Sequence, residues 1–447
     1  MTEEGEGARP RRLIGPFDAT ALVVGSMIGS GIFIVSAESA RLVGTSSGLL
    51  LVWSVAGLLT FLAALSCAEL AALYPRAGGP YVFFREAYGE LAGFLFAWTL
   101  IAVVQAGTIA AVAVAFAKFL GVLVPAVTGW TAKGVAVAVV AVLTGTNALG
   151  LKAGTRTQNV LTVIKVAALL GLTAAGLLLS PRTAALSTGA RPDLSVPSGT
   201  GLAFAFALAL VGPSFAQSAW TNVTFPGAEV RDPGRTLPFA LIAGCLLVSV
   251  LYVVANVSYL KVLGLTGVAY AAADRVGTAS AAALLPGSGG SLMAAAILVS
   301  TFGCANGLIL AGARVLYALS ADGLFFSPAA RLNRAGVPGI ALVLQALWTA
   351  VLIASGTYSE LLRYVVSVEL VILILLVLAV PVLRKKEPAL ARPFRTPAWP
   401  LLGGGFVLAA TGMVVLLAIA SPRTTWPGVL LVLAGAVVYR LRRERPA

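Results

Sequence analysis

Residues 25–31 read GSMIGSG and lie inside an apolar run that resumes with Ile32 and Phe33. Three glycines and two serines weaken a helix. In hydrocarbon a loosened backbone is more costly still, because its polar groups find no water there. Taken alone, the stretch fits either a GxxxG helix-packing motif from Gly25 to Gly29 or a helix that is unwound to hold a ligand.

The composition places the chain in a membrane. Of its 447 residues, 59% are hydrophobic and 11% are charged, and the mean hydropathy is +0.96, whereas a soluble domain has about 25% charged residues. The apolar runs are continuous and long, which predicts membrane-spanning α-helices and not alternating strands. The first run has no small-residue cleavage site, so we interpret it as a retained helix and not as a signal peptide.

The apolar runs predict an all-α polytopic membrane protein with twelve transmembrane helices, each close to the roughly 20 residues that cross a hydrocarbon core. We expect a cytoplasmic tail over 1–12, five helices over 13–179, five over 201–383, a final pair over 400–440 and a cytoplasmic tail over 441–447. The predicted spans are 13–43 (broken at 25–31), 48–73, 91–120, 130–149, 158–179, 201–228 (broken near 212–219), 237–262, 291–320, 338–356, 361–383, 400–420 and 426–440.

Basic residues in the loops give the orientation. With a cytoplasmic N-terminus, the inner segments carry 21 of the 31 Lys and Arg residues and the outer segments nine, as the positive-inside rule expects. The net charge of +14 is then explained by contact with anionic lipid headgroups, and nucleic acid is not an expected partner. We therefore predict a protein of the inner (plasma) membrane with both termini in the cytoplasm.

The sequence gives no reason to expect a metal, a cofactor or catalysis. It has no histidine, and Cys67, Cys245 and Cys304 are scattered through apolar runs without CxxC spacing. It also lacks the GxxxxGK[ST] nucleotide loop of an ATP-driven pump. Because there is neither a catalytic constellation nor a soluble domain, the chain is not predicted to be an enzyme.

The sixth span contains a second weak point. Gly212 and Pro213 interrupt LVGPSFAQSAW (210–220), although such a pair by itself can be a simple kink. The sixth span comes five spans after the first, an odd number, so the two spans cross the membrane in opposite directions. That arrangement indicates an inverted repeat of five plus five helices. Discontinuous helices at matching positions predict a transporter substrate site near the midplane.

Several motifs, in order along the chain, resemble the amino acid–polyamine–organocation (APC) superfamily. They are GSMIGSGIF in the first span, AELAALYPRAGGPYVFFREAYG (68–89), FAQSAWTNVTFPGAEVRDPGRTLP (215–238), FGCANGLILAGARVLYALSADGLF (302–325) and RPFRTP before the eleventh span. The nearest subgroup is the L-type amino acid transporters and their bacterial relatives. The resemblance implies a leucine-transporter-like fold with helices 1 and 6 broken, and amino acid transport by alternating access.

The resemblance also implies how a zwitterionic amino acid is held. Backbone N–H groups in the first break bind the carboxylate, and the Ser30 hydroxyl is a further donor. Backbone carbonyls at the helix ends bind the ammonium, and Phe215 resembles the aromatic gate over the substrate. The implied N–H donors are Gly29, Ser30 and Gly31, the implied carbonyl acceptors are Met27, Phe215 and Ser218, and Gly107 and Thr108 border the side-chain pocket.

Lys165 lies mid-span in NVLTVIKVAALLGL, about 12 Å deep. A buried lysine is costly unless it is paired or neutralised. By resemblance it occupies the place where sodium-coupled members of the fold bind Na⁺, near Ser300 and Cys304. The implication is Na⁺-independent transport.

Glu369, in YVVSVELVILILL, is the second intramembrane charge. It either points into the pocket and favours a cationic substrate, takes part in proton coupling, or forms a structural pair. A further set of charges faces the cytoplasm and fits either an inner-gate ion pair or plain solvated loops. That set is Glu69, Arg76, Glu229, Arg231 and Arg235.

The predicted function is Na⁺-independent secondary transport of neutral amino acids, by exchange or facilitation. The alternative is a proton-coupled symporter or exchanger of cationic amino acids or polyamines on the same fold, using Glu369 or Lys165. Animal relatives join a heavy chain through an extracellular cysteine between helices three and four, but residues 121–130 contain none. We therefore expect no disulfide-linked heavy chain, and a chain that can work as a monomer.

Overall fold

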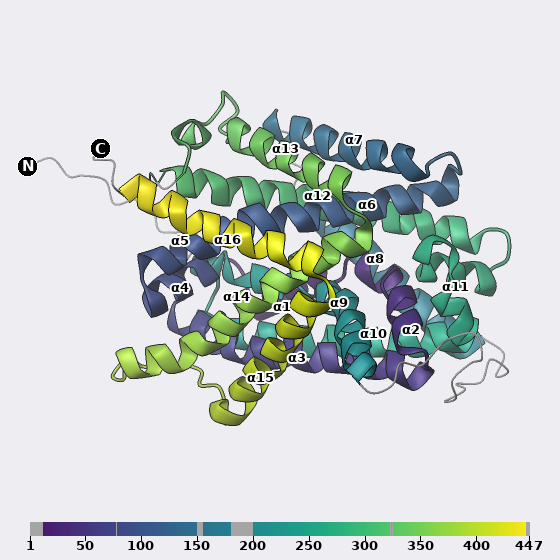
Figure 1. Cartoon of the computed structure of the whole chain (residues 1–447), viewed down its shortest axis with the longest axis horizontal. Helices are drawn as coiled ribbons and strands as arrows, with labels where there is room; N and C mark the ends of the chain where they lie inside the picture. Colours follow the sequence, from purple (N-terminus) through teal and green to yellow (C-terminus); the bar gives the residue numbers. More distant parts are fainter. Residues whose placement is uncertain are drawn as a thin grey trace, which may run out of the picture.

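The computed structural model describes residues 12–76, 78–149, 155–179, 200–321, 323 and 325–443. This part of the chain is almost entirely helical (Figure 1), and its one β-type contact is an isolated bridge between Ile14 and Val230. The terminal tails predicted over 1–12 and 441–447 lie largely outside the described residues.

Nine helical stretches in the described ranges are long and apolar enough to cross a membrane. Two shorter apolar helices, Val163–Leu179 and Gly339–Ser355, accompany them. The prediction of an all-α polytopic membrane protein is therefore confirmed. The helices are α1 (Pro16–Met27), α2 (Ser36–Val43), α3 (Ser46–Leu73), α4 (Pro80–Tyr88), α5 (Glu90–Thr99), α6 (Ala106–Leu123), α7 (Gly129–Ala148), α8 (Thr155–Leu179), α9 (Thr200–Ala216), α10 (Pro233–Ala269), α11 (Val276–Leu284), α12 (Gly289–Ala321), α13 (Gly339–Ser355), α14 (Tyr358–Lys386), α15 (Trp399–Ala420) and α16 (Pro422–Arg443).

The first break begins later than predicted. α1 continues through Gly25 to Met27, Ile28 turns to extended backbone, and one 3₁₀ turn, η1 (Gly31–Phe33), leads towards α2. The predicted break over 25–31 is therefore wrong for residues 25–27. Glycine and serine lower helix propensity by at most about 1 kcal/mol each, and an intact helical hydrogen bond remains the cheapest way to satisfy the backbone in hydrocarbon.

The second break also begins later than predicted, because α9 runs through the Gly-Pro pair at 212–213 and ends at Ala216; the interruption therefore falls at the end of the predicted range 212–219. Proline has no N–H for the carbonyl four residues back. That carbonyl, of Ala209, accepts a hydrogen bond from Ser39 Oγ of α2 at 2.8 Å. Since the freed group has a partner, the helix continues. It is interrupted only before Ala219, whose φ is 68°.

A widened turn joins α5 to α6. Residues Leu100–Gln105 (η2) form a π-helical turn, in which carbonyls lose their usual partners. The Ala102 oxygen accepts instead from Trp348 Nε1 at 2.7 Å and from the Tyr364 hydroxyl at 3.2 Å. The turn therefore anchors this part of the bundle to α13 and α14.

The bundle is built around the long helix α10, which packs along α3 and contacts both α1 and α2. α6 packs against α12 and α14, and α7 and α13 lie side by side along one edge (Figure 1). α10 changes direction at Gly264, whose φ of 67° is accessible to glycine at little cost. α10 thus supports both α1 and η3 (Trp220–Thr224), the 3₁₀ turn that follows the second break.

Ion pairs tie α2 to its neighbours. Arg363 Nη2, near the start of α14, donates to Glu38 at 2.6 Å. Arg41 Nη1 pairs with Asp274, in the loop before α11, at 2.8 Å, and Asp274 also pairs with Lys118 of α6 at 3.4 Å. The short helix after the first break is therefore held by charge to two other elements, α14 and the loop before α11, and that loop is in turn paired with α6.

Candidate functional site

The ends of the two broken helices lie against each other. The hydroxyl of Tyr252, on α10, lies 2.9 Å from the carbonyl oxygen of Met27 and 3.3 Å from that of Ala216. These are the last residues of α1 and α9. A Cβ on Gly31 would come within 2.8 Å of the Ala216 Cβ, so the close approach requires glycine. The structure thus joins the two breaks into one locus.

The segment after α1 carries backbone donors without backbone acceptors. In the described chain, the N–H groups of Gly29, Ser30 and Gly31 make no backbone hydrogen bond. The Ser30 hydroxyl is only 3% exposed and also lacks a partner there. Beside Gly29 there is open space, because a Cβ built on it would meet no atom within 4 Å apart from its chain neighbours. Successive backbone N–H groups outside a helix attract anions, and the Gly29 N–H also interacts with the Tyr252 hydroxyl, so this space suits a carboxylate.

The carbonyls predicted to hold an ammonium are partly engaged within the protein. The Met27 oxygen accepts from Tyr252, and the Phe215 oxygen accepts from the Ser218 N–H at 3.1 Å. Phe215 itself is buried near the end of α9. The C-terminal ends of α1 and α9 carry partial negative charge, which suits a positively charged group. The substrate and gate roles of these residues stay predictions.

Lys165 reaches the end of α1 from α8. Its side chain is 4% exposed, and its Nζ donates to the carbonyl oxygen of Gly25 in the last turn of α1. The Cys304 thiol of α12 lies close enough to interact electrostatically with Lys165. The buried Ser300 hydroxyl has no hydrogen-bond partner among the described residues. A cation at a helix C-terminus offsets the partial charge there, so Lys165 steadies one side of the break.

The part of α6 predicted to border the side-chain pocket, at Gly107 and Thr108, is tightly packed. A Cβ on Gly107 would clash with the Val365 side chain of α14 and lie near Tyr364. The hydroxyl of Thr108 donates to the Val104 oxygen of its own helix at 2.6 Å. Gly107 therefore permits close packing of α6 on α14, and the proposed role of both residues in the side-chain pocket stays a prediction.

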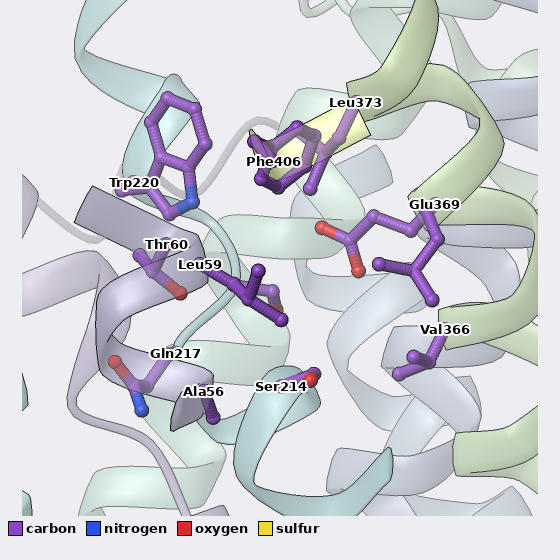
Figure 2. Close-up of a pocket in the computed structure, with 12 residues that line it drawn as sticks. Ala56, Leu59, Thr60, Ser214, Gln217, Trp220, Val366, Glu369, Leu373 and Phe406 are labelled. Atoms are coloured by element: carbon purple, nitrogen blue, oxygen red, sulfur yellow. The ribbon is translucent and has the colours of Figure 1, made fainter. Parts of the chain in front are cut away.

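A small cavity lies beside the end of α9, between α3, α14 and α15 (Figure 2). Its volume is about 30 Å³, which holds a water molecule but not an amino acid. The Glu369 carboxylate projects into it. The other walls are mainly apolar side chains of α3, α14 and α15, and the remaining polar groups are Thr60, Ser214, Gln217, Ser218 and Trp220.

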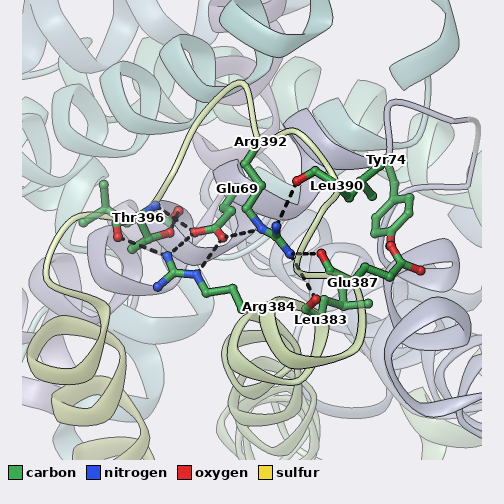
Figure 3. Close-up of polar contacts among 9 residues, drawn as sticks. Glu69, Tyr74, Leu383, Arg384, Glu387, Leu390, Arg392 and Thr396 are labelled. Atoms are coloured by element: carbon green, nitrogen blue, oxygen red, sulfur yellow. Dashed lines mark hydrogen bonds and ion pairs between the residues drawn. The ribbon is translucent and has the colours of Figure 1, made fainter.

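A buried ion-pair cluster ties the end of α3 to the end of α14 (Figure 3). Arg384 Nε and Nη2 donate to the two carboxylate oxygens of Glu69 at 2.9 and 2.6 Å, and the Thr396 N–H donates at 2.7 Å. Arg392 Nε lies 3.5 Å from the same carboxylate. The Glu69 side chain is only 2% exposed. Glu69 is therefore not part of a solvated loop, which was one of its two predicted roles.

Tyr74 extends this cluster through Glu387. Its hydroxyl donates to Glu387 Oε2 at 2.6 Å, and burial together with the neighbouring carboxylate raises the pKa of Tyr74. Arg76, by contrast, is a surface residue: its side chain is 62% exposed and pairs with Glu86 at 3.3 Å. Glu69 and Arg76, which were predicted together as charges facing the cytoplasm, thus have different environments.

Sequence reasoning missed the polar face of α10. Ser249 Oγ donates to Gln217 Oε1 at 2.8 Å, Tyr252 reaches both breaks, and Asn256 Oδ1 accepts from Ser36 Oγ of α2 at 2.6 Å. These three residues of α10 stand three and four apart, which places them on one helix face. That spacing within an apolar run was the signal that could have found them.

The chain matches the family described as "Amino acid permease" over residues 14–439. It is 28% identical to the "Serine/threonine exchanger SteT" of Bacillus subtilis (strain 168), over 98% of both chains. It is 26% identical to the "b(0,+)-type amino acid transporter 1" of Homo sapiens, over 99% of this chain and 90% of that one. It is 27% identical to the "Large neutral amino acids transporter small subunit 2" of Homo sapiens, over 98% and 81%.

These matches span both broken helices and almost the whole described bundle. The relatives are transporters and exchangers and not enzymes. The helices found here agree with a multi-pass membrane transporter. This chain therefore belongs to the amino acid permease family of the APC superfamily, with relatives among the L-type amino acid transporters.

Proposed function

We propose that the protein transports neutral amino acids across the inner membrane by alternating access, without Na⁺, as an exchanger or facilitator. The observation that carries this proposal is the open space at the first break. There three backbone N–H groups make no backbone hydrogen bond, the buried Ser30 hydroxyl has no hydrogen-bond partner among the described residues, and partially negative ends of α1 and α9 lie alongside. Such a locus can pair the carboxylate and the ammonium of one zwitterion.

The proposed architecture is a leucine-transporter-like fold of twelve crossings, with inverted repeats over 13–179 and 201–383 and a final pair over 400–440. α1 and α2 would form the first crossing, and α9 with the segment after it the sixth. Two features support this: both helices end mid-bundle, and they meet at Tyr252. Broken helices at matching repeat positions are typical of transporter binding sites. With this arrangement both termini would lie in the cytoplasm.

Lys165 supports the Na⁺-independent part of the proposal. Its ammonium is buried and already donates a hydrogen bond to the Gly25 carbonyl, which carries partial negative charge at the end of α1. A fixed positive charge at that place repels a second cation. We propose that Lys165, with Ser300 and Cys304 beside it, replaces a sodium ion.

The choice of neutral substrates draws on the names of the relatives, a serine/threonine exchanger and a large neutral amino acid transporter. One relative is named a small subunit, yet residues 121–130 of this chain contain no cysteine for a disulfide to a larger partner. We therefore propose a protein that works without a disulfide-linked heavy chain and can work as a monomer.

Counterflow in proteoliposomes tests this function. Vesicles loaded with unlabelled L-serine should take up radiolabelled L-serine, and replacing Na⁺ by choline outside should not change the rate. Ser30→Leu should reduce uptake to background, because leucine fills the space beside the N–H groups. Absence of counterflow for serine and for other neutral amino acids, or a Na⁺ requirement, would refute the proposal; selective uptake of cationic amino acids or polyamines would favour the alternative substrate class.

A further inference from the structure

Glu369 is a carboxylate in the middle of a membrane-spanning helix. It stands eleven residues after Tyr358, the first residue of α14, which corresponds to about 16 Å along the helix axis and to the middle of a core roughly 30 Å thick. Charged groups at that depth are rare and face the bundle interior or a cavity, where they mark ion and proton pathways. Glu369 faces a cavity, as Figure 2 shows.

Glu369 makes no hydrogen bond or ion pair within the described part of the chain. The charges nearest to it along α14 are both engaged elsewhere, because Arg363 pairs with Glu38 and Arg384 with Glu69. A structural pair, one of the three roles open from sequence, is therefore absent in these ranges. An ionised carboxylate without a partner at this depth is costly.

Among the residues that the structure describes, no other titratable group lines the cavity. α3, α9 and α15 present hydroxyl, amide and apolar side chains to it. Elsewhere on α14 and on the elements packed against it, five titratable groups have neighbours other than Glu369. Two tyrosines donate to backbone oxygens: Tyr88 of α4 to Leu375, and Tyr364 of α14 itself to Ala102. Two charged groups are paired, Lys118 of α6 with Asp274 and Glu69 of α3 with Arg384. Tyr439 of α16 packs on Phe94.

A second unpartnered group lines the same cavity. Gln217, immediately after α9, is fully buried, and its Nε2 donor has no acceptor among the described residues, although its Oε1 accepts from Ser249. Ser218 follows it and lines both this cavity and the predicted ammonium site. The cavity is therefore a small, mainly apolar chamber with a few polar groups in its wall, and it lies directly against the break that substrate would occupy.

We propose that Glu369 is the proton-binding group of the transport cycle, and that its cavity couples proton release to the rearrangement of the broken end of α9. This inference rests on the proposed amino acid transport and replaces its passive mode: the carrier moves a proton together with the amino acid, the coupling that the sequence offered as the alternative. While the cavity is closed, the carboxylate holds one proton and is neutral. When α9 moves and water enters, the O–H bond breaks, the proton passes to water and the carboxylate becomes hydrated. No other bond changes.

Room and chemistry favour a proton over two other occupants. A metal cation needs several oxygen ligands, and the wall of this cavity is mainly apolar. A basic substrate side chain would need an opening from the N–H groups at Gly29 to Glu369, and the cavity has no such volume. A proton needs only the carboxyl oxygen itself.

The test uses purified full-length protein in proteoliposomes and radiolabelled L-serine. With the outside more acidic by about one pH unit, a carrier that moves one proton with each amino acid can accumulate serine up to about tenfold. The wild type should respond in this way, and serine addition should acidify the lumen, as read by an internal pH dye. Glu369→Gln should lose both responses but retain serine counterflow at equal pH. Glu369→Asp should retain a pH response.

Glu360→Gln, at the exposed start of α14, is the matched control and should behave as wild type. Wild-type uptake that ignores the pH gradient, or an unchanged gradient response in Glu369→Gln, would overturn the assignment while leaving amino acid exchange intact. If Glu369→Gln lost only arginine uptake, the cavity would instead be a pocket for a basic substrate side chain. If Glu369→Gln lost a response to Na⁺, the cavity would be a metal site. Failure of wild-type counterflow, by contrast, would refute the proposed transport function itself.

Discussion

Replacing Glu69 by glutamine should destabilise the protein strongly, although the two side chains have nearly the same shape. Four donors face this carboxylate: two from Arg384, one from the Thr396 backbone and one from Arg392. Glutamine offers one acceptor oxygen, so its amide must face at least one of the donor groups. Breaking a buried pair by removing one charge costs about 3–5 kcal/mol, since the other charge remains buried.

The measurement is thermal unfolding in detergent, followed with a thiol-reactive fluorophore. Cys67 and Cys245 are free and buried, so they react only when the bundle opens, and Cys67 stands two residues from Glu69. Glu86→Gln is the matched control. Glu86 pairs with Arg76 and Arg85 at 3.3 and 3.6 Å with largely exposed partners, and such pairs contribute about 0–1 kcal/mol.

The expected order is a clear drop in melting temperature for Glu69→Gln and almost none for Glu86→Gln. Adding Arg384→Gln to Glu69→Gln should recover part of the loss, because removing both charges leaves less uncompensated charge than removing one. Equal melting temperatures for the two single variants, or additive losses in the double variant, would refute this account of the cluster.

Three further predictions concern the broken helices. Gly31→Ala should lower both stability and transport, because its methyl group would come within 2.8 Å of Ala216. Gly29→Ala, the control, should leave the melting temperature unchanged. Equal melting temperatures for the two variants would contradict this explanation of the close packing at Gly31. Tyr252→Phe should cost about 1–3 kcal/mol in the same melting assay, since Met27 and Ala216 lose a buried donor. Lys165→Ala should abolish serine counterflow without reducing expression, and normal uptake by this variant would exclude the proposed role.

Local sequence was sufficient for much of the fold. Long apolar runs predicted the membrane helices, and the weak stretches at GSMIGSG and in the sixth span predicted two interruptions. Their positions were less accurate, because a helix end depends on partners outside the helix. α9 passes through Pro213 since Ser39, far away in sequence, supplies a hydrogen bond to the freed carbonyl. No local propensity contains that contact.

The sequence by itself determined that the chain is a helical membrane protein, that it has two weak points, and which residues carry intramembrane charge. Only the tertiary structure decided what these charges face. Lys165 meets the end of α1, Glu69 meets Arg384 across 315 positions of sequence, and Glu369 meets a cavity. The physical reason is that the cost of a polar group in hydrocarbon is fixed locally, whereas the partner that offsets it is fixed by helix packing.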